Sequence, residues 1–136
     1  MTDRTLRKSI YLAAAPETVW EFLTDPDLLE KWFHRPTTPL KSGEDLDMRH
    51  ADGKSVIWGK VNDARAPEYL EYTFQIAPLG EAETLVKWRL EPVDGGTKLS
   101  LEHSGLPAGA AAFGLTLALD KGWDEHLGRL RSSSAD

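Results

Sequence analysis

A long stretch of alternating apolar and polar residues, followed by one long helical pattern, most constrains the fold of this chain. Within Leu40–His103, apolar side chains recur at every second position of several short runs, which is typical of strands with one buried face. Asp52-Gly53 and Asp94-Gly95-Gly96 separate runs as hairpin turns. Ala110–Leu130 instead repeats apolar residues at helical spacing. The pattern predicts an antiparallel sheet covered on one face by a helix of about 20 residues.

The N-terminal part adds one strand and two short helices. Arg4–Ala13 alternates as a strand, and Pro16 suits the first position of a helix. Asp25-Pro26 ends that helix and starts a second, with Asp25 as the expected N-cap, and His34-Arg35-Pro36 ends the second helix. We therefore predict an α+β fold in one domain, residues 1–136. Its curved antiparallel sheet has six strands wrapped around the long C-terminal helix, and the two short helices follow strand 1.

Composition excludes several functional classes. The net charge is −6 with a pI near 5.2, and no basic stripe appears, so we predict no nucleic-acid partner. Cysteine is absent, which excludes disulfides and thiolate chemistry. The N-terminus MTDRTLRKSI lacks the apolar core of a signal peptide, and no apolar run reaches the length of a membrane span. A cytoplasmic location without a membrane span is therefore expected.

Five tryptophans in 136 residues form the most unusual feature of the composition. Each one buries a large area and usually needs a partner for its N–H group. They are Trp20, Trp32, Trp58, Trp88 and Trp123. A heavily aromatic core and an aromatic-lined cavity both account for this number, and the two interpretations stay open at this level.

Four spaced stretches resemble a known protein family. They are APETVWEFLTDPDLLEKWF (residues 15–33), GKVNDARAPEYLEYTF (59–74), TKLSLEHSGLP (97–107) and GWDEHLGRL (122–130). The chain is similar to the START-like, Bet v 1-like (SRPBCC) superfamily with its helix-grip fold. Within it, the chain resembles proteins related to the activator of the Hsp90 chaperone ATPase. The resemblance implies a ligand-binding cavity between the sheet and the long helix, and it makes a chaperone partner possible.

Strand parity and helix spacing select the residues expected to line such a cavity. By parity Tyr72, Phe74 and Trp88 lie on the concave face, whereas Trp58 fits either register. The predicted ligand-binding residues are Trp32, Phe33, Met48, Trp58, Tyr72, Phe74, Trp88, His103, Trp123 and His126. Arg49, His50 and His103 are the candidates for polar groups that orient a ligand. Small residues at Gly109–Gly114 could leave room at one end.

Two histidines carry the only candidate chemistry. His103 shares the buried face of its strand with Leu101, and His126 follows Trp123 on the apolar stripe of the long helix. Each could contact a ligand, but the structural alternative is favoured for both, as a histidine with a satisfied hydrogen bond for His103 and a helix-edge histidine near the C-terminal turns for His126. No metal-ligand spacing, nucleophile elbow or phosphate loop is present, so we predict no metal, no cofactor and no catalytic residue.

Three functional hypotheses follow from these patterns. The first is a binding protein for an apolar or aromatic small molecule. The second is an interaction module, either a chaperone cofactor or a stress-response partner, that uses outer-face charges such as Lys87, Arg89 and Lys98. The third is a cyclase or hydrolase with His103 as general base, although a non-enzymatic role is favoured. The oligomeric state is left open.

Overall fold

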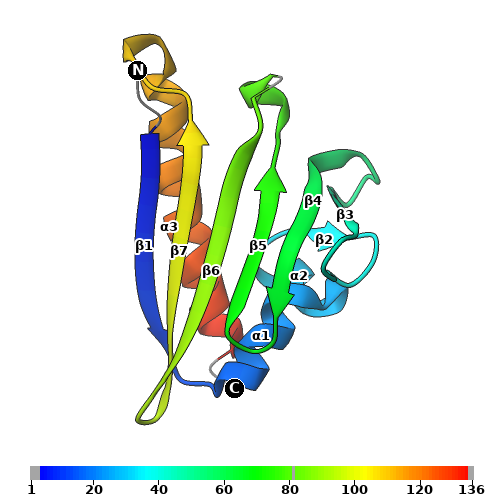
Figure 1. Cartoon of the computed structure of the whole chain (residues 1–136), viewed down its shortest axis with the longest axis vertical. Helices are drawn as coiled ribbons and strands as arrows, with labels where there is room; N and C mark the ends of the chain where they lie inside the picture. Colours follow the sequence, from blue (N-terminus) through cyan, green and yellow to red (C-terminus); the bar gives the residue numbers. More distant parts are fainter. Residues whose placement is uncertain (1–3, 81, 135–136) are drawn as a thin grey trace.

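The computed structural model describes residues 4–80 and 82–134 (Figure 1). The strands of the described residues are β1 (Arg4–Leu12), β2 (Arg35–Pro36), β3 (Asp45–Arg49), β4 (Ser55–Arg65), β5 (Tyr69–Phe74), β6 (Thr84–Val93) and β7 (Gly96–Leu106). The helices are α1 (Pro16–Thr24), α2 (Pro26–Trp32) and α3 (Phe113–Ser134), with short 3-10 turns η1 (Ala77–Leu79) and η2 (Ala110–Ala112). The strands form one antiparallel sheet in the order β1-β7-β6-β5-β4-β3-β2.

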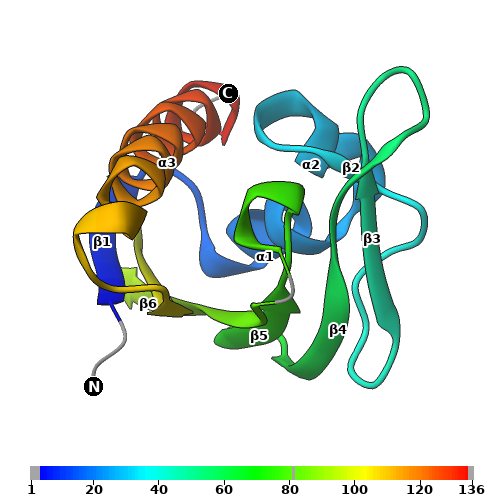
Figure 2. The ribbon, with the colours of Figure 1, turned by 90° about the horizontal axis from the view of Figure 1, so that it is seen from above.

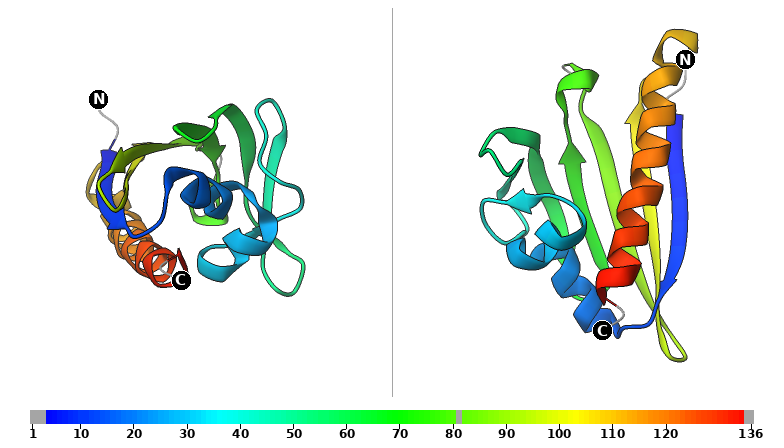
Figure 3. Two further views of the ribbon diagram at one scale, coloured as in Figure 1. Left: turned by 90° about the horizontal axis from the view of Figure 1, so that it is seen from below. Right: turned by 180° about the vertical axis from the view of Figure 1, so that it is seen from behind.

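All three α-helices lie on the concave side of this sheet. Figure 2 shows the strands curving around α1, with α3 beside β1 and α2 beside β2 and β3. From behind, α3 crosses the sheet diagonally and leaves the β3–β4 end to the two shorter helices (Figure 3). The helix-grip fold predicted from the sequence is confirmed, because a curved antiparallel sheet holds one long C-terminal helix.

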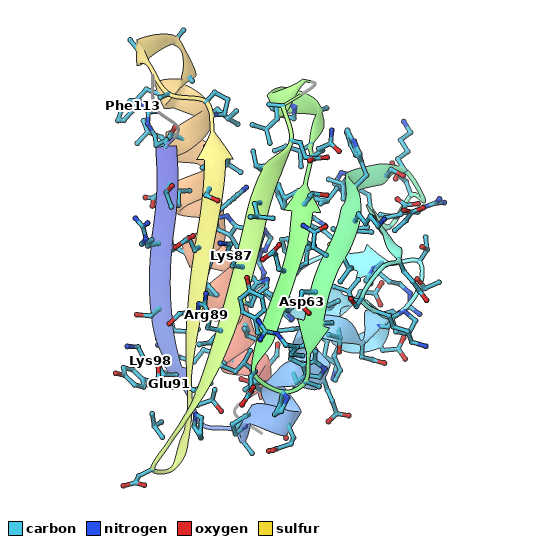
Figure 4. All side chains as sticks on the ribbon, in the orientation of Figure 1. Asp63, Lys87, Arg89, Glu91, Lys98 and Phe113 are labelled. Carbon is cyan, nitrogen blue, oxygen red and sulfur yellow. The ribbon has the colours of Figure 1, made fainter. Side chains whose placement is uncertain are left out.

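The alternation in the strands separates a buried face from an outer face as predicted. In β7, Leu99, Leu101 and His103 are buried, and the residues between them are more exposed. On the outer face, Figure 4 shows Lys87 and other charged side chains of the central strands turned away from α3. Burial of one face of each strand supplies the core, because apolar area removed from water stabilises at about 25 cal/mol per Å².

Two side-chain hydrogen bonds define the start of α2 and its packing against α1. Asp25 is the N-cap of α2, and its carboxylate accepts a hydrogen bond from the backbone N–H of Leu28 at 3.2 Å, which confirms the predicted cap. The indole N–H of Trp32, at the end of α2, donates to the carbonyl of Phe22 in α1 at 2.8 Å. This buried bond fixes the orientation of the two helices, and thereby places the chain that follows Trp32.

One strand more than predicted is present, because the prediction had six and the sheet has seven among the described residues. The extra strand is β2, where Arg35 pairs with Arg49 and Pro36 with Met48 of β3. We expected this stretch only to end a helix. Two residues are too short to show a period-two pattern. Pro36 ends the helix whether a loop or a short strand follows, so it does not indicate the strand. The two residues form a strand only because β3 lies beside them in the folded chain, which is a tertiary effect.

Polar contacts hold α3 against the edge strand β1. The ammonium group of Lys8 lies 2.8 Å from a carboxylate oxygen of Asp120 and 2.8 Å from one of Asp124. Nearer the start of the helix, the Arg4 guanidinium donates to the hydroxyl of Thr116 at 2.6 Å. These contacts fix the N-terminal half of α3 on β1. Its other side then faces β4 and β5, where the candidate site lies.

Candidate functional site

A pocket of about 240 Å³ lies between α3, the β4–β5 part of the sheet and the segment after α2. Most of the wall is apolar. Its apolar residues are Phe33, Val56, Ile57, Phe74, Ile76, Ala118, Leu119, Gly122 and Trp123, and its polar residues are His34 and His126. Ligand sites typically combine apolar walls with a small number of polar groups that fix orientation. The composition of this pocket fits that description.

Small residues of α3 create the space. Ala118 and Gly122 stand one turn apart on the helix face that lines the pocket. A Cβ atom added at Gly122 would meet no atom within 4 Å, so its missing side chain leaves open volume. Sequence reasoning had expected the room to come from Gly109–Gly114, at the start of the helix, and none of those residues lines the pocket.

Stacked aromatic side chains form the wall nearest α2. The ring of Phe33 lies between two indoles, with centroids 5.2 Å from Trp32 and 5.3 Å from Trp123. Trp88 meets the indoles of Trp32 and Trp123 edge to face, at 5.9 and 5.6 Å. Such geometries are the favoured ones for aromatic pairs. Trp88 itself is fully buried, and therefore supports the wall from behind without facing the pocket.

His103 belongs to a buried hydrogen-bond chain behind the pocket. Trp123 Nε1–H donates to His103 Nδ1 at 3.1 Å, so Nδ1 carries a lone pair and Nε2 carries the proton. Nε2–H then donates to the Thr84 hydroxyl at 2.8 Å, and that hydroxyl donates to the carbonyl of Phe74 at 2.6 Å. Burial lowers the pKa of His103 to about 4, which keeps the ring neutral.

This hydrogen-bond chain bears on the hypothesis of His103 as general base. Both ring nitrogens are engaged and the side chain is 0% exposed, so no lone pair is directed at the pocket. The geometry matches the structural alternative for this residue, a satisfied histidine that connects α3 to the sheet.

A group of histidines lies at the polar end of the pocket. The ring of His34 has centroids 5.6 Å from His126 and 5.7 Å from His50. His126 Nδ1 lies 3.1 Å from the carbonyl oxygen of Trp32 and 2.5 Å from a guanidinium nitrogen of Arg129. Only one of these two contacts is a hydrogen bond at a time, because Nδ1 carries either a proton or a lone pair.

The surroundings disfavour a charged imidazole at this end. Burial, then the neighbouring His126, His50 and Arg129, lower the pKa of His34 to about 4. Burial also lowers the pKa of His126, against the contact with the Trp32 carbonyl that raises it. Both side chains are therefore neutral at pH 7, and each offers one N–H donor and one lone pair.

The structure divides the ten predicted site residues into three groups. Four of them line the pocket, namely Phe33, Phe74, Trp123 and His126. Five are buried behind its walls, namely Trp32, Met48, Tyr72, Trp88 and His103. Trp58 is the tenth, and it lies on the outer face in a hollow with Asp47 and Gln75. Of the five tryptophans, Trp32 and Trp88 thus belong to the filled core, Trp20 packs against it, and Trp123 belongs to the pocket wall.

Sequence reasoning missed part of the wall. Val56, Ile57 and Ile76 lie near strand ends, where parity is a weak guide, and Leu119 and Gly122 were on the predicted helical stripe without being assigned to a site. Of the polar candidates, Arg49 pairs with Asp47 at 2.8 Å, and neither Arg49 nor His50 lines the pocket. His34, which was predicted to end the second helix, does line it.

Residues 4–80 and 82–134 contain no group of three or more His, Cys, Asp or Glu side chains that could hold a metal ion. In the same part of the chain, no helix has both the length and the hydropathy needed to cross a membrane. The cytoplasmic location remains a prediction.

A curved sheet that grips a long helix, with a pocket between them, defines the helix-grip class of proteins. The chain belongs to the family described as activator of Hsp90 ATPase homolog 1-like protein, whose sequence model matches residues 13–134. No curated protein sequence matches the chain significantly. The family assignment confirms the resemblance found in the sequence.

Solved structures show the same fold over nearly the whole chain. Protein MLL2253 from Mesorhizobium loti is 25% identical, with 96% of each chain covered and a TM-score of 0.82. A structure described as the Aha1 dimer from Colwellia psychrerythraea is 19% identical, covers 97% of this chain and 96% of its own, and has a TM-score of 0.80. DynU16, from the dynemicin biosynthetic locus, is 23% identical, with 94% of this chain and 46% of its own covered, at a TM-score of 0.82.

Proposed function

We propose that this protein binds a small apolar or aromatic molecule in the pocket between α3 and the β4–β5 part of the sheet. One observation carries the proposal. The aromatic wall of Phe33, Phe74 and Trp123 faces the open volume left by the absent side chain of Gly122. A flat ring in that space would contact aromatic surfaces and leave water, which is the main source of affinity in such sites.

The size of the pocket limits the ligand. A volume of about 240 Å³ is below the range of roughly 300–1,000 Å³ that holds drug-sized molecules. A molecule of one or two fused rings is therefore the expected size, whereas a long lipid would have to extend out of the pocket.

The test uses Trp123 as an internal probe. Native mass spectrometry of the purified protein shows any co-purified ligand as excess mass. Titration with one- and two-ring aromatic compounds is then expected to give a saturable change in tryptophan fluorescence. Trp123→Phe should remove most of that change, because this indole lines the pocket. Trp58→Phe is the matched control and should retain it, since Trp58 lies on the outer face.

The opposite results would count against small-molecule binding. No excess mass, together with no saturable change for any compound, would show that the pocket holds no ligand of this class. A change that persists in Trp123→Phe and disappears in Trp58→Phe would move the site to the outer face.

A chaperone partner is the second candidate function, and the outer face of the sheet supports it. A shallow hollow of about 290 Å³ there is lined by charged side chains, among them Arg7, Lys87 and Arg89. Arg7 lies 3.3 Å from the carboxylate of Glu102, and the ammonium of Lys87 lies 4.0 Å from it, so one acid is shared between two bases. An acidic surface of a partner could complete the pairing.

The chaperone alternative has its own test. Binding of an Hsp90-type chaperone, measured by interferometry at low and high salt, is expected to weaken with salt and with Lys87→Glu. The matched control is Lys41→Glu, an exposed lysine outside that hollow. No measurable binding at low salt would overturn the alternative and leave the pocket proposal unaffected.

A further inference from the structure

The polar groups of the pocket are gathered at one end. The lining contains no carboxylate, and its titratable side chains are His34 and His126. The guanidinium of Arg129 lies against the His126 ring, and the His50 ring lies beside His34. Although the whole chain has a net charge of −6, the lining at this end of the pocket contains no acidic side chain, and the acid that acts on His126, Glu125, lies outside the lining.

His34 is open to a ligand. Among the described residues, neither ring nitrogen of His34 has a hydrogen-bond partner, although the side chain is half-buried and lines the pocket. His126 differs, because its Nδ1 contacts the Trp32 carbonyl and Arg129, which leaves Nε2 as its available nitrogen, and Nε2 carries the proton when Nδ1 accepts from Arg129. The His34 nitrogens are not among the buried atoms that lack a partner, so they are accessible from the pocket, and a ligand that bonds to them gains affinity.

We infer that the ligand is an anion, whose one- or two-ring apolar body lies against Phe33, Phe74 and Trp123 and whose carboxylate or phenolate group meets His34 and His126. The inference rests on the proposed function and names the class of its ligand. A carboxylate accepts hydrogen bonds without donating any, so it satisfies histidine N–H groups. The nearby Arg129 guanidinium is always protonated and adds attraction.

The protein should take up a proton when it binds an anion. The groups facing His34 are His126 and Arg129 from α3 and His50 after β3, and Glu125 also acts on His126. Burial first, and then the positive charge of His126, His50 and Arg129, keep the pKa of His34 low in the free protein, at about 4. A bound carboxylate offsets the repulsion from these neighbours and stabilises the imidazolium. Affinity should therefore rise as pH falls from 7 toward about 5, where a carboxylate of pKa near 4 is still ionised.

The experiment compares 2-naphthoate with its neutral isostere 2-naphthamide by titration calorimetry. Charge-assisted hydrogen bonds are about twice as strong as neutral ones, so 2-naphthoate should bind at least about tenfold more tightly. Repeating the titration in buffers of different ionisation enthalpy measures the protons taken up by the wild-type protein, and we expect a fraction of one proton at pH 6.

Variants locate the anion-binding group. His34→Phe keeps a ring and removes both nitrogens, so 2-naphthoate should lose much more affinity than 2-naphthamide, which loses only a neutral hydrogen bond, and the preference should fall to about twofold or less. His34→Gln, which retains a donor, should keep part of the preference. Lys41→Gln is the control and should leave the preference unchanged, because Lys41 is exposed and does not line the pocket.

The outcomes separate the two proposals. Equal affinity for 2-naphthoate and 2-naphthamide, with no proton uptake, overturns the anion inference and leaves small-molecule binding standing. Binding of neither compound overturns both. An unchanged preference in a folded His34→Phe protein assigns the anion to another group and overturns this site.

Discussion

The indole N–H of Trp123 donates a hydrogen bond to Nδ1 of His103 at 3.1 Å, across the buried contact between α3 and β7. This bond joins one of the ligand-facing residues to the sheet and determines the tautomer of His103. It also turns the edge of the Trp123 indole inward, so that its ring packs against Phe33 and Phe74 at the pocket wall.

Replacement of His103 by leucine should destabilise the protein by about 2–4 kcal/mol. The change leaves the indole N–H of Trp123 buried without an acceptor, and such a group costs about 1–3 kcal/mol beyond the altered packing. Urea unfolding followed by far-UV circular dichroism measures the free energy. In a double-mutant cycle with Trp123→Phe, the two losses should be less than additive, and strict additivity would show that the bond contributes nothing.

Stability should decrease on mild acidification because of the buried histidines. His103 takes up a proton near pH 6.5 when unfolded but only near pH 4 when folded, since burial lowers its pKa. Its contribution is therefore fully present above about pH 6.5 and is lost as pH falls toward 4. The slope from His103 alone is about 1 kcal/mol per pH unit. Urea midpoints between pH 7.5 and 5 measure it, and His103→Leu should reduce the slope by that amount.

Filling the pocket from α3 should prevent ligand binding without unfolding the protein. Gly122→Ala is expected to stabilise by up to about 1 kcal/mol, because alanine is the better helix former and its Cβ meets no atom within 4 Å. Gly122→Leu should occupy the pocket and weaken binding of any small ligand at least about tenfold. Gly128, on the exposed side of the same helix, provides the control, because Gly128→Leu should leave binding intact.

The tryptophans should differ sharply in their importance for folding. Trp88 is 0% exposed and contacts two other indoles, so Trp88→Ala should cost about 3–5 kcal/mol, if the protein folds at all. Trp58→Ala removes a half-buried side chain on the outer face and should cost about 1 kcal/mol or less. Thermal melts of the two variants test this division, and similar losses would contradict the assignment of Trp58 to the outer face.

Much of the fold was predictable because its signals are periodic. Leu99, Leu101 and His103 alternate with polar neighbours, and that period places all three on the buried face. The N-cap at Asp25 followed from the residue types alone. Trp58 was not predictable, since Val56, Ile57 and Trp58 are three consecutive apolar residues with no parity of their own. Its side of the sheet is set by pairing, in which Met48 lies opposite Ile57 and Asp47 opposite Trp58.

The candidate site was predictable only in part. Residues on one stripe of α3 were correctly expected to face the sheet, because helical spacing alone places them there. The pocket itself lies where the surfaces of α3 and the sheet do not touch. That place involves Gly122 opposite β4 and the half-buried Phe33 after α2. No periodic signal reports such a mismatch, since it depends on the curvature of the sheet and the diagonal course of the helix.

The amino-acid sequence by itself determined the strand and helix periods, the buried face of most elements and the resemblance to a helix-grip family, because those properties depend on residues near one another in the chain. Only the tertiary structure decided the pairing of β2, the neutral tautomer of His103 and the gathering of His34, His50 and His126 at one end of the pocket. Each of these depends on contacts between segments distant in the sequence, whose approach is set by packing of the whole core.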